Sequence, residues 1–482
     1  MMPEAATLMR QGSGASERIP GSFRDPSGYV FRREGRLFRA IDTDCYAALM
    51  ALVEKGLWTK LIAAGLLVPT CLIEDPALRQ TLAAESPGYQ HFLEHQIVPQ
   101  ISYPYEWSVS MLADAALCTL DLQLRLLEAG CSLKDASAYN IQFVAGRPQF
   151  IDLSSIERPA RLDIWFALGQ FQRMFTYPLL LCRYHGWDLR SYFLTHLDGR
   201  SLEEMGRLLG WVDRLRPGLL LDFTLPLLLS RKADRSAAGG SEMLERANRD
   251  AAPQVMNLRR LRSKIKRLAD SYKPRGVWAE YTSTCSYDDE AQQAKRALVR
   301  QFLEAARPAR VLDMGCNTGD YSYLAAECGA QVLAADGDHD AVEILYRRLR
   351  RSPAAITPLV IDLTNPSPAI GYRNEERPGF LQRLDVDCVL ALALMHHLLV
   401  TGNLSLPAIR DLFYSMTQDY LVLEYVPTDD VMFRRLMKFR VDLFGDLTLD
   451  RCRQVFQERF TLVSEEPIAG SPRTLFILRK RS

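Results

Sequence analysis

A glycine-containing turn between an apolar strand and a helix is the part of the chain best suited to chemistry. Residues 311–320 read Val-Leu-Asp-Met-Gly-Cys-Asn-Thr-Gly-Asp, and a helical pattern follows at once. A second apolar segment, residues 331–335, ends on Asp336. Asp336 follows the first glycine by about 20 residues, the spacing at which an acid meets a nucleotide ribose. The pattern predicts a site for a nucleotide-containing cofactor.

The turn departs from the dinucleotide-binding pattern G-x-G-x-x-G. It contains Gly315, Asn317 and Gly319, with Asp313 two residues before the first glycine. Gly315 permits a tight turn, and Gly319 lets the helix begin against the cofactor. The backbone N–H groups of the turn are expected to meet a ligand carboxylate. Asparagine suits position 317 because it is among the residues least penalised at positive φ.

The sequence Asp-Met-Gly-Cys-Asn-Thr-Gly resembles the first motif of the class I S-adenosylmethionine-dependent methyltransferases. The resemblance spans residues 278–480 and implies an α/β Rossmann-like domain of seven strands with an antiparallel last strand. It implies S-adenosylmethionine as cofactor and no metal in this domain. The residues that it places around the cofactor are Asp313, Gly315, Cys316, Asn317, Gly319, Asp336, Asp338 and Asp362.

Two of these acids have specific roles in the resemblance. Asp336 would bind the ribose hydroxyls, with Asp338 as a second candidate, and Asp362 would bind the adenine amino group. Each role has a structural alternative. Asp336 would otherwise cap a helix that begins at Asp340, and Asp362 would belong to the turn Asp-Leu-Thr-Asn-Pro.

A pair of histidines follows another apolar strand, residues 387–394. Reacting groups gather at the carboxyl ends of strands in open α/β sheets. Imidazole titrates near neutral pH, so His396 or His397 would serve as general base for an acceptor with a proton to lose. In the alternative, one histidine only packs inside the following helix.

Strand patterns near the C-terminus favour a methyltransferase over an NAD-binding fold. Residues 420–426 form an apolar strand, and residues 460–463 and 474–478 form a terminal hairpin. An antiparallel strand at this place is characteristic of class I methyltransferases.

The first part of the chain has a different organisation. Residues 29–41 predict a β-hairpin, and the pattern at 44–64 predicts one helix that ends at Gly65. A loop and two short strands later contain Asp135, Asn140 and Asp152. This order resembles the catalytic and metal-binding loops of protein-kinase-like folds, in which an α+β domain binds Mg-ATP. The resemblance implies Mg²⁺ at Asn140 and Asp152.

This second resemblance is incomplete. No glycine-rich phosphate loop follows the hairpin pattern, Arg39 stands nearest the place of the usual lysine, and Leu-Ser rather than Phe-Gly follows Asp152. In the structural alternative, Asp135 and Asn140 cap a loop and Asp152 ends a strand. The motifs of both parts, with Asn-Pro-Ser-Pro at 365–368 and Ala-Leu-Met-His-His-Leu at 393–398, resemble bacterial two-part methyltransferases related to nodulation proteins.

Composition narrows the classes of function. Lys plus Arg number 59 and Asp plus Glu 58, so the whole chain has no charge suited to nucleic acid or anionic membrane. Ten dispersed cysteines without a CxxC pair argue against a zinc site and a disulfide scaffold. Residues 218–229 are too short an apolar stretch to span a bilayer, and the N-terminus lacks a signal-peptide pattern. We expect a cytoplasmic protein with no membrane span.

The patterns divide the chain into four parts. We expect a flexible tail at 1–22, a kinase-like domain at 23–230, a linker at 231–256 and a methyltransferase domain at 257–482. A basic amphipathic helix at 258–268 has a solvated face and no interleaved aromatics, which gives no nucleic-acid signal.

The predicted activity is methyl transfer to an unidentified acceptor, which is a small molecule, a glycan or a protein, with the first domain aiding recognition. A kinase-like phosphotransferase that uses Asp135, Asn140 and Asp152, and a non-catalytic cofactor-sensing scaffold, are the alternatives.

Overall fold

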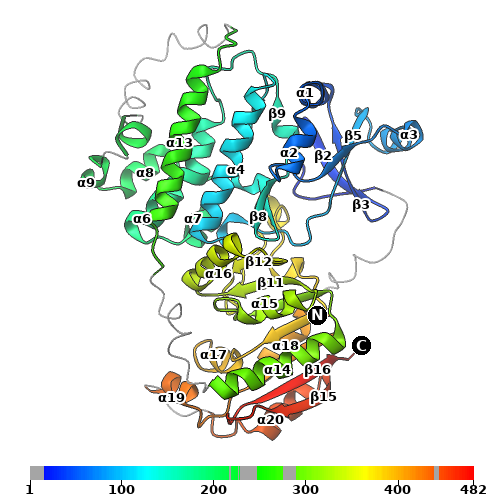
Figure 1. Ribbon diagram of the computed structural model, residues 1–482, viewed down its shortest axis with the longest axis vertical. Helices are drawn as coiled ribbons and strands as arrows, with labels where there is room; N and C mark the ends of the chain where they lie inside the picture. The colour runs from blue at the N-terminus through cyan, green and yellow to red at the C-terminus, as the bar shows by residue number, and fades with distance from the viewer. Residues whose placement is uncertain are drawn as a thin grey trace.

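The computed structural model describes residues 16–216, 219–225, 227, 247–274, 289–438 and 444–481. Most of the expected tail and linker, and residues 275–288 of the expected methyltransferase domain, lie outside these residues. The described elements form two halves, with most of residues 16–274 above and most of residues 289–481 below in Figure 1.

The first half begins with an antiparallel sheet in the order β1-β2-β3-β5-β4. The expected hairpin is present, and its turn at Glu34 and Gly35 has positive φ at both residues. Where one helix was expected at 44–64, two form, because the chain turns at Gly56 with φ +62°. The strands and helices of this region are β1 Glu17–Arg18, β2 Gly28–Arg33, β3 Arg36–Ile41, α1 Thr43–Glu54, α2 Trp58–Ala63, β4 Thr70–Leu72, α3 Pro76–Glu85 and β5 His91–His95.

A helical layer completes the first half, with the largely buried helix α4 (Val109–Leu127) at its centre. Short antiparallel pairs follow α4: β6 Ser132–Leu133 with β9 Ile156–Glu157, and β7 Ile141–Val144 with β8 Arg147–Phe150. The further helices are α5 Leu168–Phe171, a π-helical turn Gln172–Thr176, α6 Tyr177–His185, α7 Leu189–Thr195, α8 Leu202–Leu208, α9 Trp211–Arg214 and a π-helical turn Leu220–Thr224.

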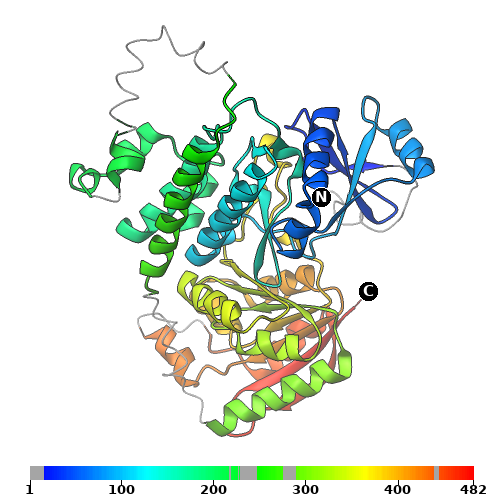
Figure 2. The same ribbon diagram turned by 45° about the horizontal axis from the view of Figure 1, so that its top comes forward.

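Helix α13 (Ala252–Ser271) is the basic amphipathic helix expected from the sequence. Its apolar face is buried at Leu258, Leu261 and Ile265. This face packs on α4 and α6, and α4 and α13 lie side by side in both ribbon views (Figures 1 and 2). The helix therefore begins inside the expected linker and belongs to the helical layer of the first half.

The second half contains a seven-stranded sheet in the order β12-β11-β10-β13-β14-β16-β15. The first five strands in this order are parallel, and β16 runs antiparallel between β14 and β15. The strands are β10 Arg310–Met314, β11 Gln331–Asp336, β12 Ile356–Val360, β13 Cys388–Ala391, β14 Tyr420–Tyr425, β15 Phe460–Pro467 and β16 Thr474–Lys480.

Both faces of this sheet are covered, which is why its parallel strands are almost continuously apolar. Successive residues of β10 alternate between two cores: Val311 packs with helices α14 and α15, and Leu312 packs with the core that includes α18 and α20. The helices are α14 Asp289–Ala306, α15 Asp320–Glu327, α16 His339–Arg351, α17 Met395–Val400, α18 Leu406–Met416, α19 Val431–Met437 and α20 Leu449–Gln457.

Buried polar contacts join the two halves. Arg383 of the second half forms an ion pair with Glu106 of the first, and both side chains are almost completely buried. Arg24 pairs with Glu376 at 2.9 Å nearer the surface. Among the described helices, none has the length and apolar composition needed to cross a membrane.

Candidate cofactor and acceptor site

A cavity of about 700 Å³ lies where the parallel strands of the second half end. Ligands of open α/β sheets bind outside the carboxyl ends of the strands, so this is the expected edge. The structure brings most of the residues singled out in this half to the cavity wall: Asp313, Gly315, Cys316, Asn317, Asp336, Asp338, Asp362, His396 and His397.

The glycine turn is held by hydrogen bonds to the next strand. Gly315 and Cys316 donate their backbone N–H groups to the carbonyl oxygen of Ala335, at 2.8 and 3.1 Å. Asn317, at φ +48°, donates its N–H to Asp336 Oδ2 at 2.8 Å. These three N–H groups are therefore used inside the protein and are not available to a ligand carboxylate. Burial also raises the pKa of the Cys316 thiol well above its usual value.

Asp336 and Asp338, at the end of β11, accept hydrogen bonds from different parts of the backbone. Asp336 accepts one backbone N–H on each carboxylate oxygen, from Asn317 and from Asp338, both at 2.8 Å. Asp338 caps α16 by accepting from Asp340 N at 2.8 Å and Ala341 N at 3.4 Å. The alternative in which Asp336 caps this helix is wrong. Burial is the main cause of the raised pKa of Asp336.

Gly319 and Asp362 each have a role within the fold, Gly319 in packing and Asp362 in a turn. A Cβ atom at Gly319, where φ is +86°, would lie 2.4 Å from Cδ1 of Leu345. The glycine is thus required by packing against α16, which differs from the expected role beside the cofactor. Asp362 accepts from Thr364 N at 2.9 Å and Thr364 Oγ1 at 2.7 Å, which is the turn chemistry given as its alternative, and it also lines the cavity.

Asp313 is a buried carboxyl group at the base of the turn. It accepts a hydrogen bond from Ser322 Oγ at 2.5 Å. Burial raises the pKa of Asp313 to about 6, against the opposing effect of the Ser322 hydrogen bond and with a smaller contribution from Asp336. Its position below the turn makes it a support of the loop as well as part of the cavity wall.

The histidine pair begins α17 at the other side of the cavity. His396 is only 2 % exposed, and its ring lies 4.3 Å from that of His397 between centroids. No described residue is a hydrogen-bond partner of His396 Nδ1. Burial, followed by His397, lowers the pKa of His396 well below its ordinary value, and burial and Arg473 lower that of His397. Burial therefore favours the neutral imidazole of His396, a residue that lines the cavity.

A buried charged cluster, which sequence reasoning missed, stands beside the histidines. Glu424, at the end of β14, pairs with Lys295 of α14 and with Arg473, whose Nη1 lies 3.1 Å from Glu424 Oε1. Arg473 also donates to Asp430 at 2.8 Å, and Lys295 and Arg473 line the cavity. An acid within the apolar strand 420–426 was the signal that the sequence offered.

The three residues of the kinase-like pattern lie in the first half. Arg39 Nη1 lies 2.6 Å from Asp152 Oδ1, which also accepts from Ser154 Oγ at 2.6 Å, and Ser155 donates to Oδ2. Burial alone would raise the pKa of Asp152, but Arg39 and the serines bring it below its usual range. The protein itself therefore neutralises the acid expected to hold Mg²⁺, and the expectation of Mg-ATP is not borne out.

The other two residues of that pattern shape a loop. Asp135 accepts from Ser137 N at 2.8 Å, as in its structural alternative, and Asn140 ends a short 3₁₀ turn before β7. Burial and then Asp152 raise the pKa of Asp135. Across the described ranges, no group of three or more His, Cys, Asp or Glu side chains is arranged to hold a metal ion.

The strand order, the covered parallel sheet and the cavity at its carboxyl edge define the second half as an α/β protein of the Rossmann-like class. No family model matches the chain. The nodulation protein NoeA of Rhizobium meliloti (strain 1021) is 33% identical over 466 residues, which cover 96% of each chain. The chain belongs to the family of this nodulation protein, as the sequence resemblance predicts.

Solved structures give more distant matches. The N-methyltransferase NodS of Bradyrhizobium japonicum WM9 is 14% identical, with a TM-score of 0.30 over 40% of this chain and 99% of its own. The bifunctional kinase-methyltransferase WbdD is 17% identical, with a TM-score of 0.30 over 43% of this chain and 42% of its own. Similarity at this level supports no inference about function.

Proposed function

We propose that the second half is a class I methyltransferase that binds S-adenosylmethionine in the cavity and transfers its methyl group to an acceptor beside His396. One observation supports this most strongly. The cavity joins the glycine turn, Asp336 and Asp362 on one side with the histidine pair on the other. The antiparallel strand β16 between β14 and β15 is the arrangement expected of this class.

The residues present fit the cofactor. Asp336 uses one acceptor position on each oxygen for the backbone, which leaves a second on each for the two ribose hydroxyls. Asn317 Oδ1 is buried without a partner among the described residues, and it would accept from the amino group of the cofactor. Lys295 would bring positive charge toward the carboxylate of the cofactor, and the exposed Asp362 would face the adenine amino group.

Bound S-adenosylmethionine would supply an electrophilic methyl group, so the chain has mainly to orient the acceptor and exclude water. We assign the general base to His396, because the residue lines the cavity, its Nδ1 has no hydrogen-bond partner among the described residues, and its pKa is lowered by burial. A neutral imidazole takes the proton of an O–H or N–H acceptor at that atom. The ring of His397 lies against that of His396, and His397 lines the same cavity.

For the first half we propose a kinase-like fold that aids recognition of the acceptor. Its antiparallel sheet precedes a helical layer that contains the hairpin after Asp135, which supports this interpretation. The Arg39 guanidinium and two serine hydroxyls already bind the Asp152 carboxylate and compete with Mg²⁺ for its oxygens. Phosphoryl transfer is therefore not part of the proposal.

Calorimetric titration of the full chain with S-adenosylhomocysteine tests the cofactor site. Wild-type protein should bind, and Asp336→Ala should weaken binding by about tenfold or more, since hydrogen bonds to a charged group are lost. Asp419→Ala is the matched control, because it removes an exposed acid that pairs with Arg479 away from the cavity. Absence of binding by the wild type at high micromolar ligand contradicts the proposal.

The same titration tests whether His396 takes part in cofactor binding or acts as the general base. His396→Gln should bind S-adenosylhomocysteine as the wild type does, because the imidazole is assigned to the acceptor proton. A large loss of affinity in this variant would instead place His396 in the cofactor site and contradict its role as base.

A further inference from the structure

Helix α16 supports the proposed cofactor turn from behind. It begins at His339, three residues after Asp336, and Asp338 caps its N-terminus. Leu345 fills the space beside Gly319, and Arg348 pairs with Asp320 at 2.8 Å in the residue that follows the turn. Any displacement of α16 therefore displaces the turn and the end of β11 together.

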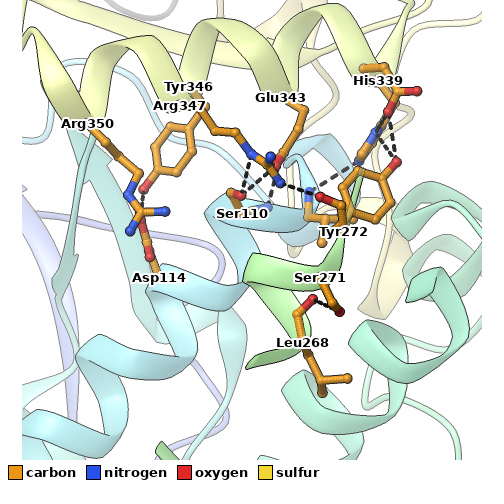
Figure 3. A network of polar contacts seen from close by, with 12 residues as sticks. Ser110, Asp114, Leu268, Ser271, Tyr272, His339, Glu343, Tyr346, Arg347 and Arg350 are labelled. Carbon is orange, nitrogen blue, oxygen red and sulfur yellow. Dashed lines mark hydrogen bonds and ion pairs between the residues drawn. The ribbon is translucent and has the colours of Figure 1, made fainter. Parts of the chain in front are cut away.

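The opposite face of α16 is fixed to the first half, as Figure 3 shows. Glu343, which is completely buried, accepts from Ser110 N at 2.9 Å and from Ser110 Oγ at 2.5 Å. Tyr346 donates its hydroxyl to Asp114 at 2.8 Å, and Arg350 pairs with Asp114 at 3.3 Å. Both faces of the helix are thus occupied, one by the cofactor turn and one by α4.

In this contact, side chains of α16 cap the N-terminus of α4. Ser108 is the N-cap residue of α4, and its side chain makes no hydrogen bond to the first turn of this helix. Instead Val109 donates its N–H to His339 Nε2 at 3.2 Å, and Ser110 donates to Glu343. The first N–H groups of a helix need such acceptors, and its dipole favours a carboxylate there.

A second connection reaches the same helix from α13. Tyr272, just beyond the end of α13, donates its hydroxyl to Asp340 at 2.8 Å, and Arg347 donates to the carbonyl oxygen of Tyr272 at 2.9 Å (Figure 3). The first turn of α16, which directly follows the proposed ribose-binding acid, is therefore held by the first half at His339 and Asp340.

We propose that Ser110, Asp114 and Tyr272 of the first half are positioning residues for cofactor binding, which act through α16 on the turn at 315–319. The inference rests on the proposed cofactor site. The first half then has a role in the reaction apart from acceptor recognition: it keeps the glycine turn and Asp336 in their binding arrangement. Because coupling free energies are reciprocal, the cofactor in turn stabilises the first turns of α4.

Two variants on opposite sides of the contact test the proposal in the full chain. Ser110→Ala and Glu343→Gln should each raise the dissociation constant for S-adenosylhomocysteine by about fivefold or more, the lower range of measured couplings between sites. Neither residue lines the cavity. Arg24→Ala is the matched control, since it breaks a contact between the halves that does not involve α16, and it should bind as the wild type does.

If both variants bind S-adenosylhomocysteine as the wild type does but have a lowered thermal midpoint, the contact between α4 and α16 only holds the two halves together. That result would overturn the proposal. Hydrogen–deuterium exchange of the wild type tests the coupling between the cofactor site and α4 without any variant, so it applies even where a variant fails to fold. S-adenosylhomocysteine should slow exchange at residues 109–127, and unchanged exchange there in a ligand-bound sample overturns the proposal. Failure of the wild type to bind the ligand would contradict the cofactor site instead.

Discussion

Burial sets the protonation of the key side chains around the cavity, and it acts on acids and imidazoles in opposite directions. It raises the pKa of Asp313 and Asp336 and lowers that of His396. In each case the neutral form is favoured, because a charge loses hydration in the interior. The site therefore holds acids whose ionised form is less stable than in water, as is common where binding groups are arranged for a ligand.

Asp313→Asn should stabilise the protein at pH 7.5. The pKa of Asp313 is about 6 in the folded chain and 3.8 in the reference state, so its ionisation lowers stability progressively between these pH values and most above pH 6. The difference corresponds to about 3 kcal/mol at most, and a gain of about 1–3 kcal/mol is expected. The gain should shrink as the pH falls from 6 toward 4, where the wild-type acid is protonated.

Urea denaturation at pH 7.5, 6 and 4.5 measures this effect. Asp419→Asn, at a half-exposed acid of the same half that pairs with Arg479, should change the free energy of unfolding by less than about 0.5 kcal/mol. A destabilised Asp313→Asn protein at pH 7.5, or a gain that grows on acidification, would show that burial does not dominate at this carboxyl.

At the scale of elements, α16 lies behind the turn that forms part of the cavity wall. Its sheet-facing side packs under the glycine turn at Gly319, and its outer side packs on α4. Leu345 of α16 can approach the start of α15 closely at Gly319 only because the glycine has no Cβ. The same residue also adopts positive φ, so a substitution there meets two separate obstacles.

Gly319→Ala and Gly329→Ala form a matched pair that separates these obstacles. Both glycines have positive φ, but a Cβ at Gly329 meets nothing within 4 Å. Strain alone should cost about 1–2 kcal/mol in each variant. Gly319→Ala should lose about 1–3 kcal/mol more through overpacking against Leu345.

Urea denaturation gives the two free energies of unfolding, and calorimetry should find weaker S-adenosylhomocysteine binding only in Gly319→Ala. Equal losses of stability in the two variants would mean that α16 moves aside without penalty, and that its packing does not shape the turn.

The sequence predicts elements with strong local patterns and misses those that depend on tertiary contacts. The strands of the second half are recognisable because a covered parallel sheet requires continuous apolar runs, and the glycine turn because Gly315 needs positive φ. The break between α1 and α2, and the packing partner of α13, were not visible in local spacing. Buried ion pairs such as Lys295 with Glu424 join residues far apart in the chain, so no local pattern reveals them.

At the scale of the whole molecule, the two halves share an interface that resembles a protein interior. Glu343 and the Arg383–Glu106 pair are almost completely buried there. Separating the halves would leave such groups without their partners, which is strongly destabilising for buried charges. We therefore expect one cooperative unfolding unit rather than two domains joined by a tether.

Tryptophan fluorescence tests this cooperativity. Five of the six tryptophans, at positions 58, 107, 165, 187 and 211, lie in the first part of the chain, far in sequence from the glycine turn. Ligand at 100 times its dissociation constant adds about 2.7 kcal/mol of stability. The fluorescence midpoint should accordingly rise by about 2–5 °C with S-adenosylhomocysteine. A midpoint that stays constant while calorimetry shows a separate, ligand-shifted transition would indicate independent halves.

The cap that α16 provides for α4 also bears on how the protein is made. Ser110 and its acceptor Glu343 are 233 residues apart. At the usual 5–20 residues per second, the first turn of α4 waits roughly 10–50 s on the ribosome before that carboxylate is synthesised. The first half leaves the ribosome early, yet one end of its central helix stays uncapped until α16 of the second half has also been synthesised, so the packing of that end follows the rest of the first half.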